Sequence, residues 1–545
     1  MLLSKIKTLA AALSCTVALS ANSALALSVE VAARGDDAPW QEPLAARLDA
    51  LRRKVEVRGS SIAVVHGDNT WLHAFGHKNL ERTDPVDVDT SFLIGSVTKS
   101  FTALGAAKAV AQGKMYWSKP LKDYVREFYP GYLGLWDPEA DNKVTLGDLL
   151  SHRTGVAGNF PVILAWNTTE ALLQHLKLLP PSAPYGTRFQ YNNIMYGLAG
   201  YLTGKATRHA DWASQIHADI FEPLGMNAST ATMKDFIETA NRSPGESPET
   251  DFLEDSVLPV TPAGVISSTA RDLGKYAHGL LQMFRGESGP FAIPPDVFAP
   301  FRENQVELDA EEQQVMQGLL LNGRNISDVS YTFGFSKAKW RNYTLFVHGG
   351  NNHGYASNLC LLPEANVAVA VLTNAEGSRG CFREAACAAA FDAVLGTDDS
   401  TSYDCPVMPM PPLPSAGRLP LSTSAYTGAF ESPVMGKMIV GVDAQGNLTM
   451  SVGERRKFFE GHLYAPEGAA PTAMDLLGVG PPGSFPLTFT AKADANATAV
   501  EGYYFVLDPR GMTKICDKPG PECQEFFKRV GDFTPTPPKC PLRPN

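Results

Sequence analysis

The sequence lacks an excess of basic residues. Its 47 lysines and arginines are outnumbered by 57 aspartates and glutamates, which gives a formal net charge of −10. Proteins that bind nucleic acid or dock onto anionic membranes usually present a basic surface, because they must neutralise phosphate groups. The charge balance therefore argues against a nucleic-acid partner and against docking onto an anionic membrane.

Long apolar runs are also missing from the chain after its N-terminal segment. No later segment reaches the roughly 18 apolar residues of a membrane-spanning helix. At the N-terminus, Lys5 and Lys7 precede an apolar stretch, and Ala24-Leu25-Ala26 forms a small-x-small cleavage pattern. These features are typical of a secretory signal peptide. We predict that residues 1–26 are removed, and that the mature protein is secreted without stable membrane insertion. An uncleaved anchor is the alternative, which the short and interrupted run disfavours.

Cysteine is scarce, and no cluster of cysteines or histidines has the spacing of a metal site, so we predict neither a metal nor a cofactor. Removal of the signal leaves an odd number of cysteines: Cys360, Cys381, Cys387, Cys405, Cys516, Cys523 and Cys540. In an oxidising compartment they favour disulfides, with at least one thiol left free or paired with another chain. Cys516 and Cys523 bracket a Lys-Pro-Gly-Pro turn and are the predicted local pair.

Sequons for N-glycosylation are more frequent than the roughly three that composition would give by chance. They begin at Asn167, Asn227, Asn241, Asn325, Asn342, Asn447 and Asn496. Asn241 is the weakest candidate, because Pro244 follows its serine. The number of sequons favours a glycosylated, secreted eukaryotic protein.

Strand-like runs lie at both ends of a region of about 360 residues, and helical periodicity dominates between them. A hairpin is predicted from Ser61–His66 and Thr70–Phe75, and later strands from Thr344–His348, Ser357–Leu362 and Val367–Leu372. An alanine-rich helix over Arg383–Leu395 closes the region. The order predicts an α/β (α+β) fold, in which helices flank one antiparallel sheet and form an inserted helical subdomain.

A change of composition marks the next boundary. Five prolines occur between Cys405 and Pro414, and short strands separated by glycine turns follow. We predict a first domain over residues 27–400, a proline-rich linker over 401–422, a small β-barrel over 423–532 and an extended tail over 533–545.

Pairs of the form Ser-x-x-Lys can supply a nucleophile and a base, but the chain contains three of them, roughly the number that its composition predicts. They are Ser4 and Lys7, Ser96 and Lys99, and Ser336 and Lys339. The first pair falls in the signal peptide, and the third lies in a strand-like, charged stretch. Only Ser96 is predicted to open a helix, which places its N–H at the positive end of the helix dipole.

On a helix, residues three apart share one face, so the amine of Lys99 can reach the hydroxyl of Ser96. The amine can accept or relay the hydroxyl proton if burial lowers its pKa. Two further elements are Tyr191-Asn192-Asn193, at a predicted loop-to-helix entry, and His348-Gly349-Gly350-Asn351, at the end of a predicted strand. A phenol can move a proton to a leaving group, an amide and an imidazole can hold substrate, and glycines permit close approach.

Together these elements resemble the superfamily of serine β-lactamases, penicillin-binding D-Ala-D-Ala carboxypeptidases and D-aminopeptidases. Its motifs Ser-x-x-Lys, Tyr-x-Asn and Lys/His-x-Gly occur in this order. The segments Thr90–Lys99, Val144–Gly155 and Pro262–Asp272 also resemble it, and the likeness covers about residues 40–395. The C-terminal segments around Tyr426, Asn447 and Phe526 resemble the lipocalin-like barrel of some members.

The resemblance implies a role for each motif residue. Ser96 is the nucleophile, and Lys99 and Tyr191 share general-base and general-acid work, the first proton acceptor being left open. Asn193, His348, Gly350 and Asn351 bind substrate, with the N–H groups of Ser96 and Asn351 as the oxyanion hole. His152 is interpreted as structural, since it lies outside the motifs.

The third motif departs from typical class C β-lactamases, which have lysine where this chain has His348. This favours an ester or peptide substrate over a β-lactam. The leading hypothesis is therefore a secreted serine hydrolase of the esterase or D-peptidase type. The alternatives are an acyltransferase resembling those of lovastatin synthesis and a catalytically inactive binding protein, which would be expected to have lost a motif.

Overall fold

The structure is a computed structural model that describes the chain from residue 38 to residue 531 with gaps. The gaps are residues 129–137, 157–162, 164–165, 167, 180–182, 246–258, 324, 353, 376, 398–404, 406–418, 420, 434, 453–460, 465–474, 480–486, 493–501 and 507–523. The predicted signal peptide and tail, most of the predicted linker, and Cys516, Cys523 and Cys540 lie outside the described residues.

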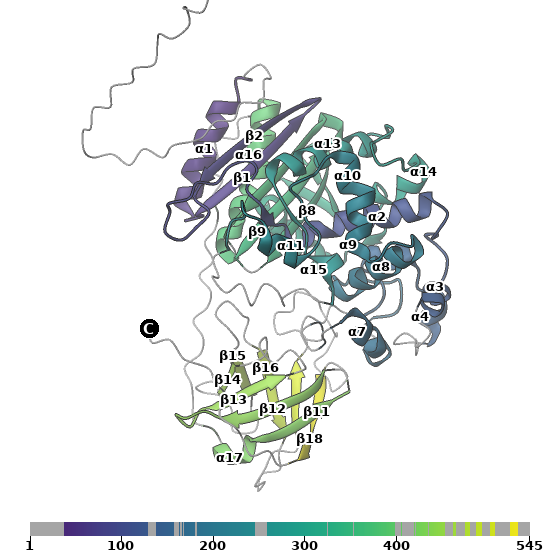
Figure 1. The fold of residues 1–545 in the computed structure, drawn as a ribbon, viewed down its shortest axis with the longest axis vertical. Coiled ribbons are helices and arrows are strands. Elements are labelled where there is room, and N and C mark those ends of the chain that lie inside the picture. Colours follow the sequence, from purple (N-terminus) through teal and green to yellow (C-terminus); the bar gives the residue numbers. More distant parts are fainter. Residues whose placement is uncertain are drawn as a thin grey trace, which may run out of the picture.

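The larger part of the molecule is built around one antiparallel sheet, whose strands differ in length. Their order is β2-β1-β10-β9-β8-β7-β6-β5 (Figure 1). The strands are β1 (Gly59–His66), β2 (Asn69–Gly76), β5 (Val306–Glu307), β6 (Ile326–Tyr331), β7 (Ser336–Trp340), β8 (Tyr343–Asn352), β9 (Tyr355–Leu362) and β10 (Val367–Thr373). A small separate pair joins β3 (Phe92–Leu93) to β4 (Ser267–Ser268). The predicted fold class is confirmed, including the sheet built from both ends of the region.

The sheet is covered on both faces, as the burial of its central strands requires. Every residue of β9 and β10 is buried. Successive residues of β1 alternate between two hydrophobic clusters, so that Val64 belongs to one and Val65 to the other. This is the period of two that a strand imposes on its side chains.

The helices that cover the two faces come from distant parts of the sequence. α1 (Gln41–Lys54) and α16 (Cys381–Leu395) share one cluster with the strands, and α2 (Thr98–Ala111), α8 (Asn193–Ala206) and α13 (Ala270–Phe284) share the other (Figure 1). The remaining helices are α3 (Leu121–Phe128), α4 (Pro138–Lys143), α5 (Leu146–Leu150), α7 (Thr169–His175), α9 (Trp212–Ile216), α10 (Glu222–Leu224), α11 (Met233–Glu238), α14 (Pro295–Phe298), α15 (Ala310–Leu319) and α17 (Thr423–Tyr426). Most of them lie between β2 and β5 in the sequence, where the inserted helical subdomain was predicted.

The C-terminal strands pair with one another in sequence order, and β18 returns to pair with β11, which closes the ring. They are β11 (Gly428–Ser432), β12 (Gly436–Val442), β13 (Leu448–Val452), β14 (Gly461–Tyr464), β15 (Asp475–Val479), β16 (Leu487–Lys492), β17 (Gly502–Val506) and β18 (Gln524–Gly531). The domain boundaries, and the likeness of this part to a lipocalin, stay predictions.

Two disulfides join cysteines of the described region. Cys360 on β9 is bonded to Cys387 on α16, with 6.6 Å between their α-carbons, and Cys381 is bonded to Cys405, with 5.5 Å. The expectation that the cysteines form disulfides is confirmed for these four, whose partners the sequence did not indicate.

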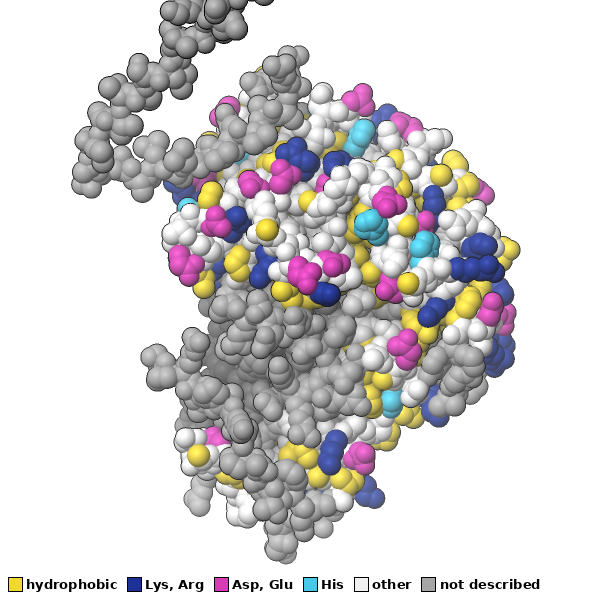
Figure 2. All heavy atoms as spheres, viewed as in Figure 1, with side chains coloured by type: hydrophobic (Ala, Val, Ile, Leu, Met, Phe, Trp, Pro, Cys, Tyr) yellow, Lys and Arg dark blue, Asp and Glu magenta, His cyan; other side chains and the backbone are white. Residues whose placement is uncertain are grey.

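The surface visible in Figure 2 intersperses basic and acidic side chains, without a large field of either sign. No helix within the described residues is long and apolar enough to cross a membrane. Four of the predicted glycosylation sites are exposed, namely Asn227, Asn325, Asn342 and Asn447. Asn241 is partly buried, and Asn167 and Asn496 lie outside the described residues.

Candidate active site

The nucleophile candidate lies in a tight turn immediately before a buried helix. Ser96 is in the 3-10 turn Gly95–Val97, and α2 begins at Thr98, so Ser96 precedes the α-helix that it was expected to open. Lys99 is in the first turn of α2, and its Nζ lies 2.9 Å from Ser96 Oγ. The sequence spacing therefore brings the two groups into direct contact, as predicted.

Lys99 has no exposed surface. Its Nζ also donates to the backbone oxygen of Ala263 at 2.8 Å, and burial lowers the pKa of its amine well below the usual value. A neutral amine has two hydrogens and one lone pair. It can therefore donate to Ala263 while its lone pair faces the Ser96 hydroxyl, which is the arrangement a base requires.

Tyr191 approaches the same hydroxyl from the loop before α8. Its phenol hydrogen-bonds to Ser96, and burial raises its pKa, so the phenol is protonated at neutral pH. Lys99 Nζ lies 4.8 Å from the centroid of the Tyr191 ring. The structure thus brings together all three residues that were predicted to be catalytic.

The cap of α8 holds this loop in place. Asn192 is the N-cap of α8, and its side-chain oxygen accepts from the N–H groups of Ile194 at 2.8 Å and Met195 at 3.3 Å. Its Nδ2 donates to the backbone oxygen of Val156 at 3.1 Å. Asn193 is the first residue of the helix and is partly exposed. The middle residue of the Tyr-x-Asn motif is therefore the one that fixes its conformation.

His152 contacts this loop as well. Its Nδ1 accepts the backbone N–H of Asn192 at 3.0 Å, and its ring centroid lies 4.5 Å from that of Tyr191. Burial, with a smaller contribution from Lys99, lowers the pKa of the imidazole well below the usual value, so His152 is neutral. The structural role expected for it includes support of Tyr191 and of the loop that carries it.

The third motif lies at the end of β8, close to the nucleophile. A Cβ built on Gly350 would lie 1.9 Å from the backbone oxygen of Ile94, and one built on Gly95 would lie 2.6 Å from the backbone N and O of Asn351. Ser357 Oγ also donates to the Ile94 oxygen at 2.7 Å. Gly350 therefore lets β8 approach the turn that carries Ser96, and the backbone of Asn351 lies beside that turn.

His348 has partners within the protein for both ring nitrogens. Nδ1 lies 2.8 Å from the backbone oxygen of Gly349, and Nε2 lies 3.1 Å from the hydroxyl of Tyr331. Since a carbonyl only accepts, Nδ1 carries the proton, and Nε2 accepts from Tyr331. Burial, and secondarily Lys99, lowers the pKa of His348 to about 3, so the ring is neutral. Direct binding of substrate by this imidazole stays a prediction.

Sequence reasoning did not find two residues at the site. Tyr331, at the end of β6, contacts His348, and Arg383, in the first turn of α16, contacts the backbone of Gly350. Neither belongs to a short motif, and each is far in sequence from part of the site, so no local signal identifies them. The other Ser-x-x-Lys pair on the described chain, Ser336 and Lys339, lacks a buried amine. Lys339 on β7 is exposed and pairs with Asp328 at 2.8 Å.

Within the described residues, no group of three or more His, Cys, Asp or Glu is arranged to hold a metal ion. The chemistry available around Ser96 is that of a hydroxyl in contact with a buried amine and a phenol, beside two backbone N–H groups. The fold and this arrangement define a serine hydrolase.

The Beta-lactamase family model matches residues 44–392, which is more than half of the chain. The chain belongs to the beta-lactamase family, which confirms the resemblance carried by the three motifs. A search of solved structures gives the same fold. The octameric penicillin-binding protein homologue from Pyrococcus abyssi superposes with a TM-score of 0.54 at 19% identity, over 89% of this chain and 99% of that one.

Curated relatives include several hydrolases. Unguisins hydrolase ungD of Aspergillus violaceofuscus (strain CBS 115571) is 25% identical over 533 residues, covering 87% of this chain and 88% of the relative. Penicillin-binding protein 4 of Amycolatopsis lactamdurans is 27% identical over 62% of this chain and 85% of its own length. Esterase EstB of Burkholderia gladioli is 29% identical over 34% of this chain and 50% of its own length.

Proposed function

We propose that the protein is a secreted hydrolase that cleaves an ester or peptide through an acyl-enzyme on Ser96. The observation that carries this proposal is the 2.9 Å contact between Ser96 Oγ and the fully buried Lys99 amine. A buried amine without charge is a base next to a hydroxyl that is otherwise a weak nucleophile.

Acylation begins when Ser96 Oγ attacks the substrate carbonyl carbon and its proton passes to the Lys99 lone pair. The negative charge on the carbonyl oxygen is stabilised by the N–H groups of Ser96 and Asn351. The tetrahedral intermediate then collapses, and the bond to the alcohol or amine breaks. The leaving group takes a proton from the Tyr191 phenol, which recovers one from Lys99.

Deacylation repeats these steps with water as the nucleophile. Water attacks the acyl carbon and gives its proton to the same pair of groups, and Ser96 Oγ leaves and is reprotonated. Lys99 is the first acceptor in this scheme because the raised pKa of Tyr191 keeps its phenol protonated. Asn193, at the start of α8, remains the proposed contact for a substrate amide.

One observation supports an ester or peptide rather than a β-lactam, namely that the third motif has the neutral His348 in place of lysine. The relatives include proteins named as a hydrolase and an esterase and others named as beta-lactamases, so the argument rests on His348. Secretion is proposed from the N-terminal segment, the sequons and the two disulfides, since disulfides persist in oxidising compartments. The C-terminal strands are proposed to form a separate lipocalin-like domain.

Covalent labelling tests the proposal. A fluorophosphonate should add to the wild-type protein with loss of fluoride, and intact-mass spectrometry with peptide mapping should place the adduct on Ser96. Ser96→Ala should abolish the adduct, whereas Ser336→Ala, which alters the competing Ser-x-x-Lys pair, should retain it. An adduct that persists in Ser96→Ala would refute the assignment. Turnover of p-nitrophenyl esters, D-amino-acid anilides and a chromogenic β-lactam would then separate the substrate classes, and we expect the β-lactam to be the poorest.

A further inference from the structure

The guanidinium of Arg383 binds the peptide unit that carries one of the two proposed oxyanion-hole donors. Arg383 is in the first turn of α16, and its Nη1 donates to the backbone oxygen of Gly350 and, at 2.8 Å, to Oδ1 of Asn351. The N–H of the same peptide unit belongs to Asn351. Arg383 therefore contacts the end of β8 at the point where the site needs a fixed backbone orientation.

Because of the geometry of the peptide bond, the contact of Arg383 with the Gly350 oxygen also fixes the direction of the Asn351 N–H. In a trans peptide the C=O and the N–H point in opposite directions. No peptide bond of the described chain is cis. Because Arg383 holds the Gly350 oxygen on one side of β8, the Asn351 N–H must point to the other side. Gly95 lies against the same stretch of backbone, since a Cβ on Gly95 would lie 2.6 Å from both the nitrogen and the oxygen of Asn351.

A charged donor on the carbonyl also strengthens the N–H as a donor. Hydrogen bonds in a chain polarise one another, and the effect is largest in a water-poor environment. The side chain of Arg383 is only 13% exposed, so little water competes for its contacts. Orientation and polarisation thus act in the same direction at Asn351.

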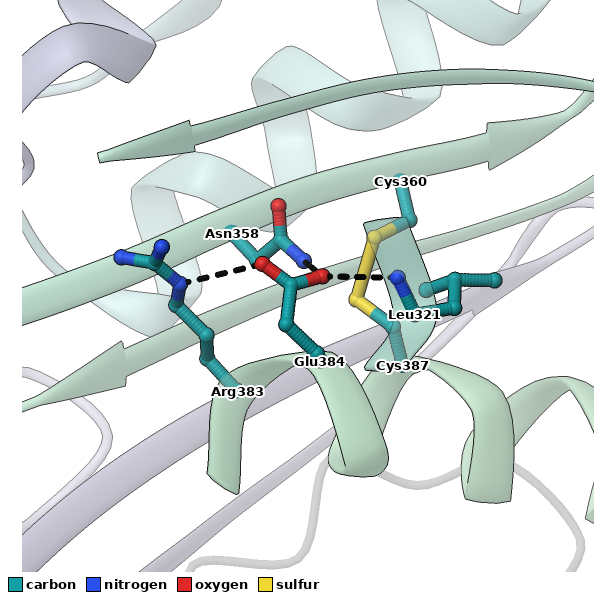
Figure 3. Close-up of a disulfide and its surroundings, with 6 residues drawn as sticks. All are labelled: Leu321, Asn358, Cys360, Arg383, Glu384 and Cys387. Carbon is teal, nitrogen blue, oxygen red and sulfur yellow. Dashed lines mark hydrogen bonds and ion pairs between the residues drawn. A yellow bond between two sulfur atoms is a disulfide. The ribbon is translucent and has the colours of Figure 1, made fainter. Parts of the chain in front are cut away.

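Glu384 fixes the guanidinium in turn. Its Oε1 accepts from Arg383 Nε at 3.2 Å, and its Oε2 accepts from Nδ2 of Asn358 at 2.7 Å and from the backbone N–H of Leu321 at 3.2 Å (Figure 3). The carboxylate is buried, and Asn358 lies on β9 directly opposite Gly349 of β8. Glu384 therefore connects α16 to β9, the strand that pairs with β8.

A covalent bond holds the same part of α16 against β9. Cys387 lies one turn after Glu384, and its disulfide to Cys360 runs beside the carboxylate in Figure 3. The helix that carries Arg383 is thus anchored to β9 by the hydrogen bond between Glu384 and Asn358 and by the disulfide.

We propose that Arg383, oriented by Glu384, is a positioning residue that aims the Asn351 N–H at the reacting carbonyl oxygen. The inference rests on the proposed function, because it assigns a role in the same oxyanion hole. Arg383 acts through the backbone and not by touching substrate. The test below distinguishes this role from two others, namely a purely structural ion pair and a binding site for a substrate carboxylate.

Exchange of the carbonyl oxygen for sulfur provides the test, because a thiono sulfur is a poor hydrogen-bond acceptor. We would measure kcat and KM for p-nitrophenyl acetate and its thiono counterpart with wild type, Arg383→Gln and Glu384→Gln. Loss of one oxyanion donor typically costs about 10²–10³-fold in kcat. Misdirection of one donor should therefore lower kcat/KM for the oxo ester by about 10–100-fold and for the thiono ester by much less, with KM nearly unchanged.

The controls separate this role from its competitors. Arg285→Gln, which removes a surface ion pair to Glu287, should leave the oxo/thiono ratio at the wild-type value. Equal losses for both esters in Arg383→Gln would indicate a structural role and overturn the proposal. A loss confined to substrates that carry a carboxylate would overturn it in favour of a binding role. If Arg383→Gln does not fold, Arg383→Lys would be measured with the same two esters, and the results would be interpreted in the same way.

A measurement without substrate keeps the two proposals distinguishable. Hydrogen exchange should become faster in peptides that cover Gly349–Asn352 of Arg383→Gln, while β1 and β10 stay protected. Unchanged exchange at β8 would overturn the positioning role even if the esters are hydrolysed. Faster exchange in a protein that acylates no ester would retain the positioning role and reject the proposed function.

Discussion

The amine of Lys99 lies above the ring of Tyr191, 4.8 Å from its centroid, and both side chains hydrogen-bond to the hydroxyl of Ser96. Neither group can therefore change its protonation without changing the field at the other. A neutral amine beside a protonated phenol has one basic and one acidic site, which is what a reaction with a proton acceptor and a proton donor requires. The pair should behave as one catalytic unit.

Kinetics of single and double variants test this coupling. Lys99→Ala and Tyr191→Phe should each lower kcat by about 10²–10⁴-fold, and the double variant should lose much less than the product of the two factors. Steady-state kinetics with one ester substrate provide the measurement. Additive losses would mean that the two groups act in separate steps.

The pH profile of kcat/KM should reflect the neutral amine. Burial lowers the pKa of Lys99, and the active form has lost the proton, so activity should rise with pH through that pKa. The plateau should be reached well below pH 10.5, the ordinary value for lysine. Lys99→Arg, which stays protonated at all accessible pH values, should show no such rise. A wild-type profile that rises only near pH 10 would contradict the assignment.

Gly350→Ala should damage both stability and activity. Its added methyl would lie 1.9 Å from the Ile94 oxygen, so β8 must move away from the turn that carries Ser96. Overpacking of this kind typically costs about 1–3 kcal/mol. Gly318→Ala is the matched control, because nothing lies within 4 Å of a Cβ at that position of α15. Thermal unfolding should show a lower Tm for Gly350→Ala and an equal or higher Tm for Gly318→Ala.

Removal of the disulfide between β9 and α16 should destabilise the protein. Cys360 and Cys387 enclose a loop with a sequence separation of 27. A loop of that length corresponds to about 3.5 kcal/mol in the chain-entropy treatment. The Cys360→Ala/Cys387→Ala double variant should therefore unfold at a lower denaturant concentration. A midpoint equal to that of wild type would show that the bond is absent in the folded protein.

Glycan mapping of the secreted protein should separate the sequons by their surroundings. We expect glycans at Asn227, Asn325, Asn342 and Asn447, which are exposed. We expect none at Asn241, because its Nδ2, the atom that a glycan modifies, donates to both carboxylate oxygens of Asp87 at 3.1 and 3.2 Å. Peptide mass spectrometry after glycosidase treatment in heavy water decides each site. An unmodified protein with an intact Met1 would contradict secretion altogether.

Much of the fold followed from local patterns. The hairpin of β1 and β2, the strands β8 to β10 and the helix α16 lie within a few residues of their predicted bounds. Their apolar periodicity, glycine turns and helix-ending Gly396 are local signals, so the sequence was sufficient. Ser96, Lys99 and Tyr191 could be singled out as candidates because each lies in a short motif with an interpretable context, and the structure brings them together.

The remaining features depend on contacts between distant segments. Nothing near Cys360 indicates that it faces Cys387 across a helix–sheet interface, and nothing near Arg383 indicates that it reaches Gly350. Gly350 was expected to admit substrate, whereas its closest neighbour is the backbone of Ile94. Such contacts between distant residues arise because the sheet packs against the turn that carries Ser96. The local sequence pattern of one strand does not contain that information.

The pairing of β1 with β10 has a consequence for biosynthesis. Ser60 Oγ donates to the backbone oxygen of Leu372, across 312 residues of sequence. At a synthesis rate of about 5–20 residues per second, the hairpin of β1 and β2 is synthesised roughly 15–60 s before β10, the strand that will cover its edge. During that time β1 presents an apolar, unpaired edge, which is the kind of surface that drives aggregation of nascent chains. Yield from a recombinant host should therefore depend more on chaperone capacity during translation than on the stability of the finished protein.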